Sequence, residues 1–435
     1  MKKIIAIELI RELLSSSAFI IRHKRKPEDF TRLRVFTVPI LLTIILRKSL
    51  KSMQLTLNEI IALLSKHITS VSNAAYTKAR QKIRHTAFIE LNQQAVVGLT
   101  YAHPHRTYHG YRLLAVDGSK IILPNTDENS ATFGSATYAN HKEHVHGSHA
   151  FALASVLYDV LNNIAVNAAL ERTDTAEIVA AKQHLPYLTS HDIVVFDRGY
   201  CSYVLMAQIA TTGADMVIRC SRASFRVANQ MFSGTGPDSV VTTLSPPKST
   251  TTSKLTAAKL PTELTMRFVR VVLPTGEIEI LATTLLDEQQ FPTETFQQLY
   301  WHRWGIETFY GTIKTRLSLE NFTGTSPESI RQDFFATIFL SGLESLLTAD
   351  ITERLQQKPT KHTQQVNNAV AFHAIKHKAF DLLVSTRKPV HIVRELTALF
   401  MTSPTLYRPD KKPERRQSVT RRTVNFFRQK RKIVF

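Results

Sequence analysis

The spacing of apolar residues divides the chain into a helical front, a middle rich in strands and a helical end. In the first hundred residues apolar positions recur every three or four residues, as in Leu57, Ile60, Ile61, Leu64 and Ile68. This is the period of an amphipathic helix, and no alternating run that would indicate a strand occurs there. The front of the chain is therefore predicted to be helical.

One helix of this front has a recognisable beginning. Ser72 and Asn73 suit the cap of a helix that runs through Tyr76 and Lys78 to Ile83, and a second helix follows at Phe88–Leu91. Two short helices joined by a turn are typical of small DNA-binding units. An ordinary helical bundle with a basic, solvated face fits the same pattern.

From Tyr111 onward, short β-branched and apolar runs predict strands. These runs are Leu113–Val116, Ala150–Val160, Asn163–Leu170 and Ile193–Phe196, and the second and third form a hairpin through Leu161 and Asn162. A helical stretch, Thr175–His184, precedes the last run, with Thr173 or Asp174 as its cap. Strand, hairpin, helix and strand in succession indicate an α/β layer arrangement.

A second group of strand signals follows, and we interpret it as a β-rich insertion at about 221–290. After a strand at Ala214–Arg219, the signals are Ser224–Ala228, Val240–Thr243, Met266–Leu273 and Ile278–Thr284. Leu244–Glu263, rich in Ser, Thr, Pro and Lys, is expected to be a mobile loop. Helices resume at Thr293, with Phe334, Phe335, Ile338 and Phe339 on one apolar face. The expected domains are 1–105, 106–345 and 346–435.

Charge changes this picture by pointing to a polyanionic partner. Lys and Arg number 55 against 35 for Asp and Glu, which gives a formal net charge of +20. Nucleic acid is the leading candidate for the partner of such a protein. Eleven of the basic residues lie between Met401 and Phe435, beside only Asp410 and Glu414. This end of the chain is expected to be a phosphate-binding arm or a solvated tail.

Cysteine usage and hydropathy bear on the compartment. The two cysteines, Cys201 and Cys220, form no CxxC pair, which argues against a disulfide framework and a thiolate zinc site. The apolar run at Met1–Leu14 is interrupted by charged residues, and Val35–Leu46 is too short to span about 30 Å of hydrocarbon as a helix. We therefore expect a soluble, cytoplasmic and nucleoid-associated protein with no membrane partner.

Two acidic residues directly follow apolar strand signals. Asp117 stands in Leu-Leu-Ala-Val-Asp-Gly and Asp197 in Ile-Val-Val-Phe-Asp-Arg-Gly. A carboxylate at the carboxyl end of a central strand is fixed by the sheet yet open to substrate. Each residue could equally be an Asp that caps the next turn, and neither alone identifies a site.

The third acid lies on a predicted helix from Tyr300 to Lys314. A turn of about 100° per residue places Tyr300, Arg303, Glu307, Tyr310 and Lys314 within a sector of roughly 80°. Glu307 could ligate a divalent cation, while Arg303 and Lys314 bind phosphates and Tyr300 donates to another. A solvated face with a weak Arg303–Glu307 ion pair is the alternative interpretation.

Four apolar residues of the same segment are expected to pack in the core. They lie on other faces of the helix than the acid, and they are Trp301, Trp304, Ile306 and Phe309. Base stacking by these side chains is the less favoured interpretation. A histidine group, His141, His144, His146 and His149, has spacing that fits no standard zinc pattern, and we interpret it as part of a solvated turn.

These motifs together resemble a known family. Tyr300-x2-Arg303-x3-Glu307-x6-Lys314 matches the YREK signature of bacterial insertion-sequence transposases of the DDE class, in their type-four family. Val-Asp-Gly-Ser and Asp-Arg-Gly-Tyr are similar to the other two acidic motifs of that family, in the same order. The resemblance covers roughly Ala74 to Phe435, including Ala-Arg-Gln-Lys at 79–82.

The resemblance implies a fold and a chemistry. The fold would be α/β, a ribonuclease-H-like mixed sheet with a β-rich insertion, flanked by a helical N-terminal domain and a helical, basic C-terminal region. Asp117, Asp197 and Glu307 would be the catalytic acids that hold two Mg²⁺ ions, with Mn²⁺ as a substitute, and Asp117 would bridge both ions.

The resemblance also implies DNA contacts. Tyr300, Arg303, Lys314 and Arg198 are the residues expected to bind DNA, and a homodimer would pair the two element ends before joining them to target DNA. Some relatives carry a tryptophan in the last insertion strand that holds a flipped base, but Ile278–Thr284 contains none. Whether a hairpin forms, or whether another side chain stacks the base, stays open.

Two further functions are compatible with the sequence. A structure-selective nuclease of the same fold would cut double-stranded DNA without joining it. A catalytically silent DNA-binding derivative of a transposase would have lost an acid, and Asp117, Asp197 and Glu307 are all present.

Overall fold

The structure is a computed structural model, and it describes residues 1–32, 34–48, 52–64, 71–139, 146–234, 236–246, 248–273 and 275–407. The chain forms two compact units. Unit 1 comprises Met1–Pro104, Ile121–Ala152 and the chain from Thr312, and unit 2 comprises His105–Lys120 and Leu153–Gly311. Units assembled from separate segments do not test the three expected domains, whose boundaries stay a prediction.

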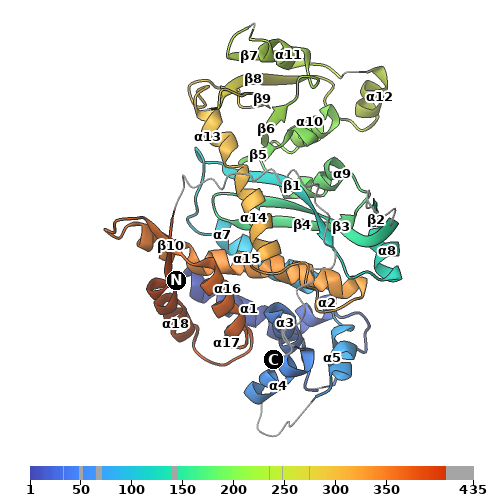
Figure 1. Cartoon of the computed structure of the whole chain (residues 1–435), viewed down its shortest axis with the longest axis vertical. Coiled ribbons are helices and arrows are strands. Elements are labelled where there is room, and N and C mark those ends of the chain that lie inside the picture. The colour runs from blue at the N-terminus through green and yellow to red at the C-terminus, as the bar shows by residue number, and fades with distance from the viewer. Residues whose placement is uncertain are drawn as a thin grey trace. The chain divides into compact units, whose positions relative to one another are not determined.

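A mixed β-sheet forms the core of unit 2 (Figure 1). Three strands run parallel: β1 (Arg112–Ile122), β5 (Asp192–Phe196) and β6 (Asp215–Cys220). Beyond β1 lie β3 (His146–Asp159) and β4 (Ile164–Arg172), so that the order is β4-β3-β1-β5-β6. Every residue of β5 is buried, as expected of a parallel strand covered on both faces. The predicted ribonuclease-H-like mixed sheet is confirmed.

The hairpin between β3 and β4 shows how local chemistry sets a turn. Asp159 accepts hydrogen bonds from the backbone N–H groups of Leu161 and Asn162 at 3.0 and 2.9 Å. Asn163 then adopts a left-handed φ of 56°, a conformation that asparagine tolerates. The predicted turn through Leu161 and Asn162 is confirmed.

The strands of the insertion extend the same sheet. β9 (Ile278–Thr283) pairs antiparallel with β6, and β8 (Leu264–Val272) and β7 (Ser239–Leu244) follow outward in that order. The β-rich character of this stretch is confirmed. The strand predicted at Ser224–Ala228 is wrong, because α11 (Arg226–Phe232) forms there instead. Ala228 and Met231, three residues apart, are both buried, so helical spacing prevails over the short alternating run.

Two other local predictions need correction. The segment Leu244–Glu263 contains a helix, α12 (Ser249–Ala257), anchored by the buried side chain of Leu255. The predicted helix before β5 is α9 (Glu177–Ala181), continued by a 3₁₀ segment, Lys182–Tyr187. Ala176 occupies the cap position of α9, and Asp174 lies in an exposed ion pair with Arg172 at 3.0 Å. The expected cap at Thr173 or Asp174 is therefore wrong.

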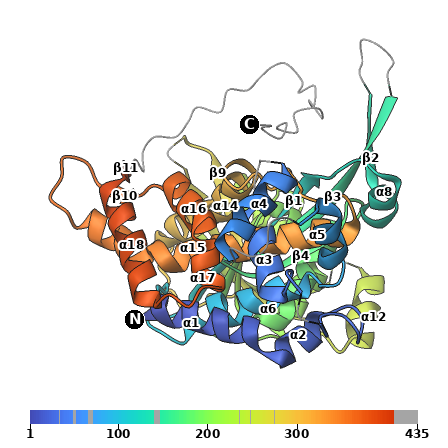
Figure 2. The ribbon, with the colours of Figure 1, turned by 90° about the horizontal axis from the view of Figure 1, so that it is seen from below.

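Helices dominate unit 1, as predicted for the front of the chain (Figure 2). The N-terminal helices are α1 (Lys2–Ser15), α2 (Ser17–His23), α3 (Val38–Arg47), α4 (Met53–Leu64), α5 (Asn73–Arg80), α6 (Thr86–Leu91), the π-helix Asn92–Gly98 and α7 (Leu99–Tyr101). Leu57 and Ile60 are buried against α3, whereas the side chain of Leu64 and all of Ile68 lie outside the described residues. Ser72 caps α5 by accepting from the Ala75 N–H, which confirms the predicted cap, but the helix ends at Arg80 rather than at Ile83.

The centre of unit 1 is α15 (Pro327–Gln356), a helix of 30 residues that is buried on most of its faces. Phe334, Ile338 and Phe339 lie in the core, and Phe335 is 7% exposed. Around α15 lie α8 (Asp127–Phe133), the hairpin of β2 (Ser135–Ala139) with the beginning of β3, β10 (Gln364–Val366), α16 (Asn368–His377), α17 (Ala379–Leu383), α18 (Pro389–Thr402) and β11 (Pro404–Leu406). Figure 2 shows α17 and α18 next to α1, with which they are in contact.

A buried ion pair joins the N-terminal helices to α15. Arg80, at the end of α5, lies 2.8 Å from Asp333, and both side chains are almost fully buried. The Arg80 guanidinium also donates to Gln332 and to the Ser329 carbonyl, so its burial is compensated by several partners. The N-terminal helices are thereby fixed to α15 by polar contacts as well as by apolar packing.

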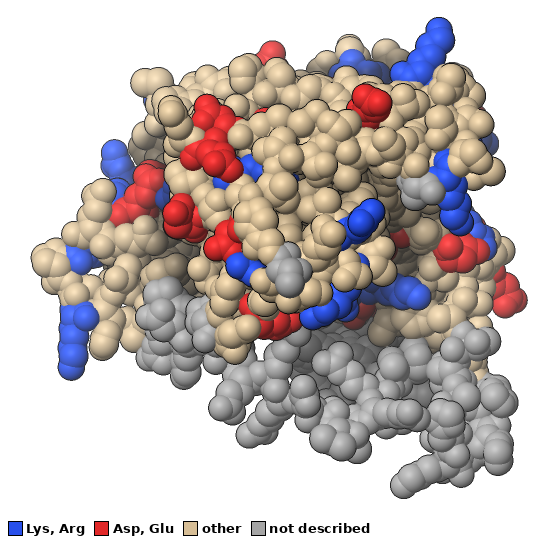
Figure 3. Space-filling model, turned by 90° about the horizontal axis from the view of Figure 1, so that it is seen from above, with Lys and Arg blue, Asp and Glu red and all other residues tan. Residues whose placement is uncertain are grey.

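The apolarity of one helix and the distribution of surface charge bear on the predicted compartment and partner. Among the described residues one helix, Pro327–Gln356, is long and apolar enough to cross a membrane, and 83% of its most apolar window is buried inside the protein. A core helix passes the same test. On the face in Figure 3, Lys and Arg side chains are interspersed with Asp and Glu over a largely uncharged surface. The basic C-terminal tail from Arg408 lies outside the described residues.

Candidate active site

Asp117 lies inside strand β1 rather than after it, which corrects the predicted strand end at Val116. β1 continues to Ile122, so the backbone is held in the sheet on both sides of the acid. The Tyr310 hydroxyl donates to the Asp117 carbonyl at 3.0 Å and to the Ala154 carbonyl at 3.1 Å. Burial raises the pKa of the Asp117 carboxyl to about 6, although the Gly118 N–H donates to it. The backbone of this acid is fixed by the sheet, and burial disfavours the charged form of its carboxyl group.

Asp197 directly follows β5, as predicted. The parallel pairing of Ala115 with Val195, continued by two residues along each strand, brings Asp117 and Asp197 to the same level of the sheet. Arg219 on β6 lies 2.8 Å from the Asp197 carboxylate. Burial favours the neutral acid, but the Arg198 backbone N–H and the guanidinium groups of Arg219 and Arg303 together hold the pKa of Asp197 below its ordinary value.

Glu307 lies in the first turn of α14 (Trp304–Thr315) and is partly exposed. The predicted single helix from Tyr300 to Lys314 is wrong, because α13 (Thr295–Trp301) ends before α14 begins. Arg303, in the turn between them, donates to Glu307 at 2.9 Å and is almost fully buried. The ion pair of the alternative interpretation therefore exists, and it is formed by a buried arginine.

Arg303 is the group that links the three acids. Its positive charge acts on Asp117 and on Asp197 in addition to its direct contact with Glu307. Its guanidinium lies over the rings of Tyr300 and Trp304, at 5.5 and 5.1 Å from the ring centroids. The Tyr300 hydroxyl in turn lies 3.5 Å from Asp197. Within unit 2, Arg303 thus contacts Glu307 directly and acts on Asp117 and Asp197 through its charge.

The remaining predicted DNA contacts have different surroundings. Arg198 follows Asp197 and is exposed. Lys314 belongs to unit 1, where its ammonium lies 4.0 Å from Glu320. Burial lowers the pKa of Lys314. Tyr310, which the sequence placed beside Glu307, is buried and bound to backbone carbonyls, so its role is structural. Contacts of Arg198 and Lys314 with DNA stay predictions.

The two tryptophans correct a packing prediction. Trp301 is 52% exposed and Trp304 is 36% exposed, whereas Ile306 and Phe309 are buried as expected. Trp301 ends α13 and Trp304 begins α14, so both rings flank the interruption between the two helices. The ring centroids lie 6.4 Å apart. An aromatic surface therefore flanks Arg303.

Sequence reasoning missed Arg219 and Glu177. Arg219 follows the β6 partner of Phe196, just as Asp197 follows Phe196, so it joins the site through a strand pairing that the sequence does not show. Glu177, at the beginning of α9, belongs to no motif. Its side chain lies so close to Gly118 that a β-carbon added there would come within 2.8 Å of it. Its charge also helps to raise the pKa of Asp117.

The donor chemistry of the site suits a divalent cation. Among the described residues, no three Asp, Glu, His or Cys side chains approach closely enough to hold a metal ion as they stand. Carboxylate oxygens are nevertheless the ligands that Mg²⁺ prefers. The Tyr200 hydroxyl is buried and has no hydrogen-bond partner in the described part of the chain. The charges of Asp117 and Asp197 add to burial in raising its pKa. Such an orphaned hydroxyl fits a site that takes up a further polar group.

The histidine group is only partly visible. His141 and His144, and the side chain of His146, lie outside the described residues. His149 has its Nε2 atom 3.0 Å from the Leu123 carbonyl oxygen and its ring edge-on to Phe151. Its contacts are those of a side chain that packs at the surface of unit 1.

Comparison with known proteins identifies the family. A family model described as the transposase DDE domain matches residues 108–343, a segment that contains Asp117, Asp197 and Glu307. Transposase InsG for insertion sequence element IS4, from Escherichia coli strain K12, is 24% identical over 291 residues. That match covers 66% of this chain and 63% of the length of the relative.

A solved structure of the piggyBac transposase synaptic complex with hairpin DNA is similar over 94% of this chain and 88% of that one, with 10% identity and a TM-score of 0.44. The resemblance to insertion-sequence transposases is confirmed by the family match and the IS4 relative. Since the family model matches more than half of the chain, this protein belongs to the family of transposases with a DDE domain.

Proposed function

We propose that this protein is a transposase that binds the ends of an insertion sequence, cleaves the DNA there and joins the freed 3′ ends to target DNA. The observation that carries the proposal is the convergence of Asp117, Asp197 and Glu307 on Arg303. The pKa values of Asp117 and Asp197 are shifted in opposite directions, and perturbed acids close to one cation are typical of functional sites.

Asp117, Asp197 and Glu307 would hold Mg²⁺, or Mn²⁺ in its place, with Asp117 shared between two ions. The ions would supply charge stabilisation and an activated oxygen nucleophile for in-line attack on a phosphodiester. The strand position of Asp117 favours the shared role, because a bridging ligand must not move between the two ions. Its raised pKa means that the charged form of Asp117, which binds a cation, prevails only above about pH 6.

The cations of the site would exchange their partners when DNA and metal bind. Arg303 and Arg219 now neutralise Glu307 and Asp197. The Arg303 Nε atom is buried and has no hydrogen-bond partner among the described residues, so the guanidinium has a donor to spare. Arg303 would donate hydrogen bonds to the phosphates that flank the scissile bond, and Arg198 and Tyr300 would do the same. Lys314 would add a further phosphate contact.

The exposed rings of Trp301 and Trp304 are candidates for the side chain that stacks on an unpaired base, since Ile278–Thr284 contains no tryptophan. They lie on either side of Arg303 in the chain and offer apolar faces to an unpaired base. We propose that one of them stacks on a base at the cleaved end, in place of a tryptophan in the last insertion strand.

The test is cleavage of a duplex that carries the element end, in Mg²⁺. The Asp197→Ala variant should lose cleavage and keep most of its DNA binding, because the acid contributes ligands rather than phosphate contacts. Asp174→Ala, which removes an exposed aspartate of the same unit, is the matched control and should cleave normally. Full cleavage by Asp197→Ala would overturn the assignment.

The joining step has its own measurement. With a labelled, pre-cleaved 3′ end and a supercoiled target plasmid, a transposase forms joined products that depend on Asp197. A structure-selective nuclease of this fold would cut in the first assay and form no joined product in the second. A homodimer that pairs two ends should appear as a complex containing two differently labelled duplexes.

A further inference from the structure

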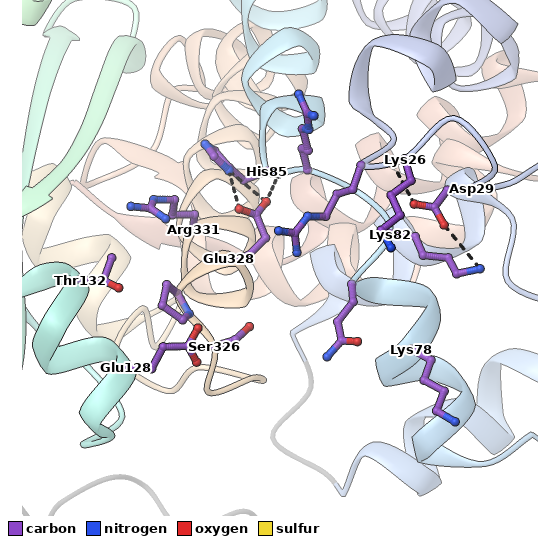
Figure 4. A pocket seen from close by; sticks show the side chains of 14 residues that line it. Lys26, Asp29, Lys78, Lys82, His85, Glu128, Thr132, Ser326, Glu328 and Arg331 are labelled. Atoms are coloured by element: carbon purple, nitrogen blue, oxygen red, sulfur yellow. Dashed lines mark hydrogen bonds and ion pairs between the residues drawn. The ribbon is translucent and has the colours of Figure 1, made fainter.

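A second feature of the molecule lies wholly within unit 1. A groove with a cavity volume of about 1100 Å³ is lined by the segment after α2, by α5 and the turn that follows it, by α8 and by the beginning of α15. Figure 4 shows Lys26, Lys78 and Lys82 on one side of it, Glu128 and Thr132 on the other, and Ser326 and Glu328 between them. We call it the basic groove.

The lining carries twice as many cations as acids. The cations are Arg25, Lys26, Lys78, Lys82, Arg84 and Arg331, and the acids are Asp29, Glu128 and Glu328. Two of the acids are already bound within the wall. Asp29 lies 3.6 Å from Lys82 and accepts from the Lys26 N–H, and Glu328 accepts from the His85 N–H at 2.7 Å. The groove therefore presents a net positive surface.

Four of the cations are not neutralised by an acidic side chain of the described residues. Arg25, Lys26, Lys78 and Arg84 are exposed, and none of them forms an ion pair with another described residue. All four line one cavity, which costs mutual repulsion unless an anion occupies it.

The scaffold beneath these cations is rigid. The turn that holds Arg25 and the turn that holds Arg84 pair like two strands, with the Arg25 N–H donating to Lys82 and the Arg84 N–H donating to His23, each at 2.8 Å. The buried Arg80–Asp333 ion pair then fixes the end of α5 to α15. The cations are thus presented in a fixed arrangement, which lowers the entropic cost of binding a regular polyanion.

The other lining residues indicate which polyanion fits. A single strand is usually held by aromatic rings on which bases stack, but the only aromatic ring in the lining, His85, is already stacked on Phe335 at 5.3 Å. Gln81 is the one amide in the lining, and the guanidinium groups of Arg25, Arg84 and Arg331 can bind phosphates bidentately as well as base edges. The groove offers charges at intervals and little else, which suits the phosphates of a duplex.

We propose that the basic groove binds the phosphate backbone of double-stranded DNA, independently of base sequence, through Arg25, Lys26, Lys78 and Arg84. The assignment of DNA as the ligand rests on the proposed transposase function. The groove makes no use of Asp117, Asp197 or Glu307. It gives the protein a hold on duplex that is separate from the acids that act on the scissile bond.

The test compares two variants of the full-length protein that lose the same charge. In the groove variant Arg25, Lys26, Lys78 and Arg84 are all replaced by Gln. In the control Lys358, Lys361, Lys388 and Arg394, four exposed cations of unit 1 outside the groove, are replaced by Gln. Affinity for a random-sequence duplex of about 30 base pairs is measured by fluorescence anisotropy over a range of salt concentrations.

The groove variant should show a shallower dependence of log affinity on log salt, by about 0.9 for each lost phosphate contact and so by about 3 to 4 in all. The control should keep nearly the wild-type slope. An equal reduction of the salt slope in both variants, or a wild-type slope in the groove variant, would overturn the proposal. An equally large loss for a single strand of the same length would also overturn it, because the groove would then not be selective for duplex.

A gain of function guards against misfolding of the groove variant. Glu128 lines the groove, is exposed and has no ion-pair partner among the described residues. The Glu128→Gln variant should bind the random duplex about two- to threefold more tightly at low salt, as expected when one repelling charge is removed. An unchanged or weaker affinity would count against the groove.

Failure of this proposal can be told from failure of the proposed function. If the groove variant binds normally and cleavage still requires Asp197, the groove assignment is wrong and the transposase assignment stands. If the wild type binds duplex through the groove but shows no cleavage that depends on Asp197, the opposite holds. The two readouts use different residues and different DNA substrates.

Discussion

Arg219 holds Asp197 and Glu279 at the same time, with nitrogen–oxygen distances of 2.8 and 2.6 Å. The contact joins the end of β5 to β9 across β6, so that a strand of the insertion helps to place one of the candidate catalytic acids. It also means that Asp197 is neutralised before any divalent cation arrives. A cation that binds Asp197 must compete with this guanidinium.

The first prediction follows from that competition. Arg219→Gln should increase the affinity for Mn²⁺ on the order of fivefold, because a competing positive charge is removed from the vicinity of Asp197. The affinity is measured by electron paramagnetic resonance, which detects the free Mn²⁺. Arg219→Lys, which keeps the charge, is the control and should stay near the wild type. A weaker affinity in Arg219→Gln would show that Arg219 organises the site more than it competes.

The second prediction concerns the stability cost of Asp117. Its pKa in the folded protein, about 6, lies above its value in the unfolded chain. The folded protein therefore holds a proton that the unfolded chain has lost, and its free energy of unfolding falls as the pH rises from about 4 through 6. Without metal at pH 7.5, Asp117→Asn should be more stable than the wild type by on the order of 1 to 3 kcal/mol.

Thermal unfolding at pH 4 and at pH 7.5 measures this difference, which should vanish at the lower pH. Added Mg²⁺ should stabilise the wild type and leave Asp117→Asn nearly unchanged, because only the wild type keeps the ligand. Glu12→Gln, an exposed acid of α1, is the control. A variant that is no more stable than the wild type at pH 7.5 would refute the account of Asp117.

The third prediction uses Glu177. Its negative charge adds to burial in raising the pKa of Asp117, so Glu177→Gln should lower that pKa. Binding of Mn²⁺ requires the charged acid, and its midpoint on the pH axis should therefore move downward by several tenths of a unit. Glu263→Gln, another exposed acid of unit 2, should leave the midpoint in place. A shift to higher pH would contradict this role.

The fourth prediction uses the fact that the chain contains only two tryptophans, both next to Arg303. Intrinsic tryptophan emission therefore reports on this site alone. Binding of a DNA end with an unpaired terminal base should quench the emission, and Trp301→Ala or Trp304→Ala should remove part of the quenching. Loss of the stacking ring should weaken binding of that end by about 1 to 3 kcal/mol.

A fully paired, blunt duplex is the comparison for this experiment, because it offers no free base to stack. Tyr407→Ala, which removes an exposed aromatic ring of unit 1, is the control variant. Equal quenching by paired and unpaired ends, with equal affinities in all variants, would exclude stacking by either tryptophan.

The sequence was a good guide wherever a residue's environment is set by its own strand. Asp197 follows a fully buried strand, and the run Ile193–Phe196 shows this without reference to any other element. The hairpin at Leu161 and Asn162 is likewise local, since Asp159 and Asn163 bring it about themselves. The motif with Tyr300, Arg303 and Glu307 was sufficient to identify the family.

The errors occur where distant residues decide the outcome. The exposed Trp301 and Trp304 flank the interruption between α13 and α14, and apolar spacing alone predicts a continuous helix there. Arg219 becomes part of the site only through the pairing of β5 with β6. Glu177 lies on a helix that precedes β5, and its side chain can approach Asp117 only because Gly118 has no side chain. Strand pairing and packing, rather than composition, select these residues.

The ion pair between Arg80 and Asp333 has a consequence for the synthesis of the protein. The two residues are separated by 253 positions, so Arg80 leaves the ribosome long before its partner is made. At about 5 to 20 residues per second the interval is roughly 13 to 50 s. During that time the apolar faces of the N-terminal helices lack α15 and stay open to chaperones or to neighbouring chains. Slow translation between these two positions should therefore lower the yield of folded protein.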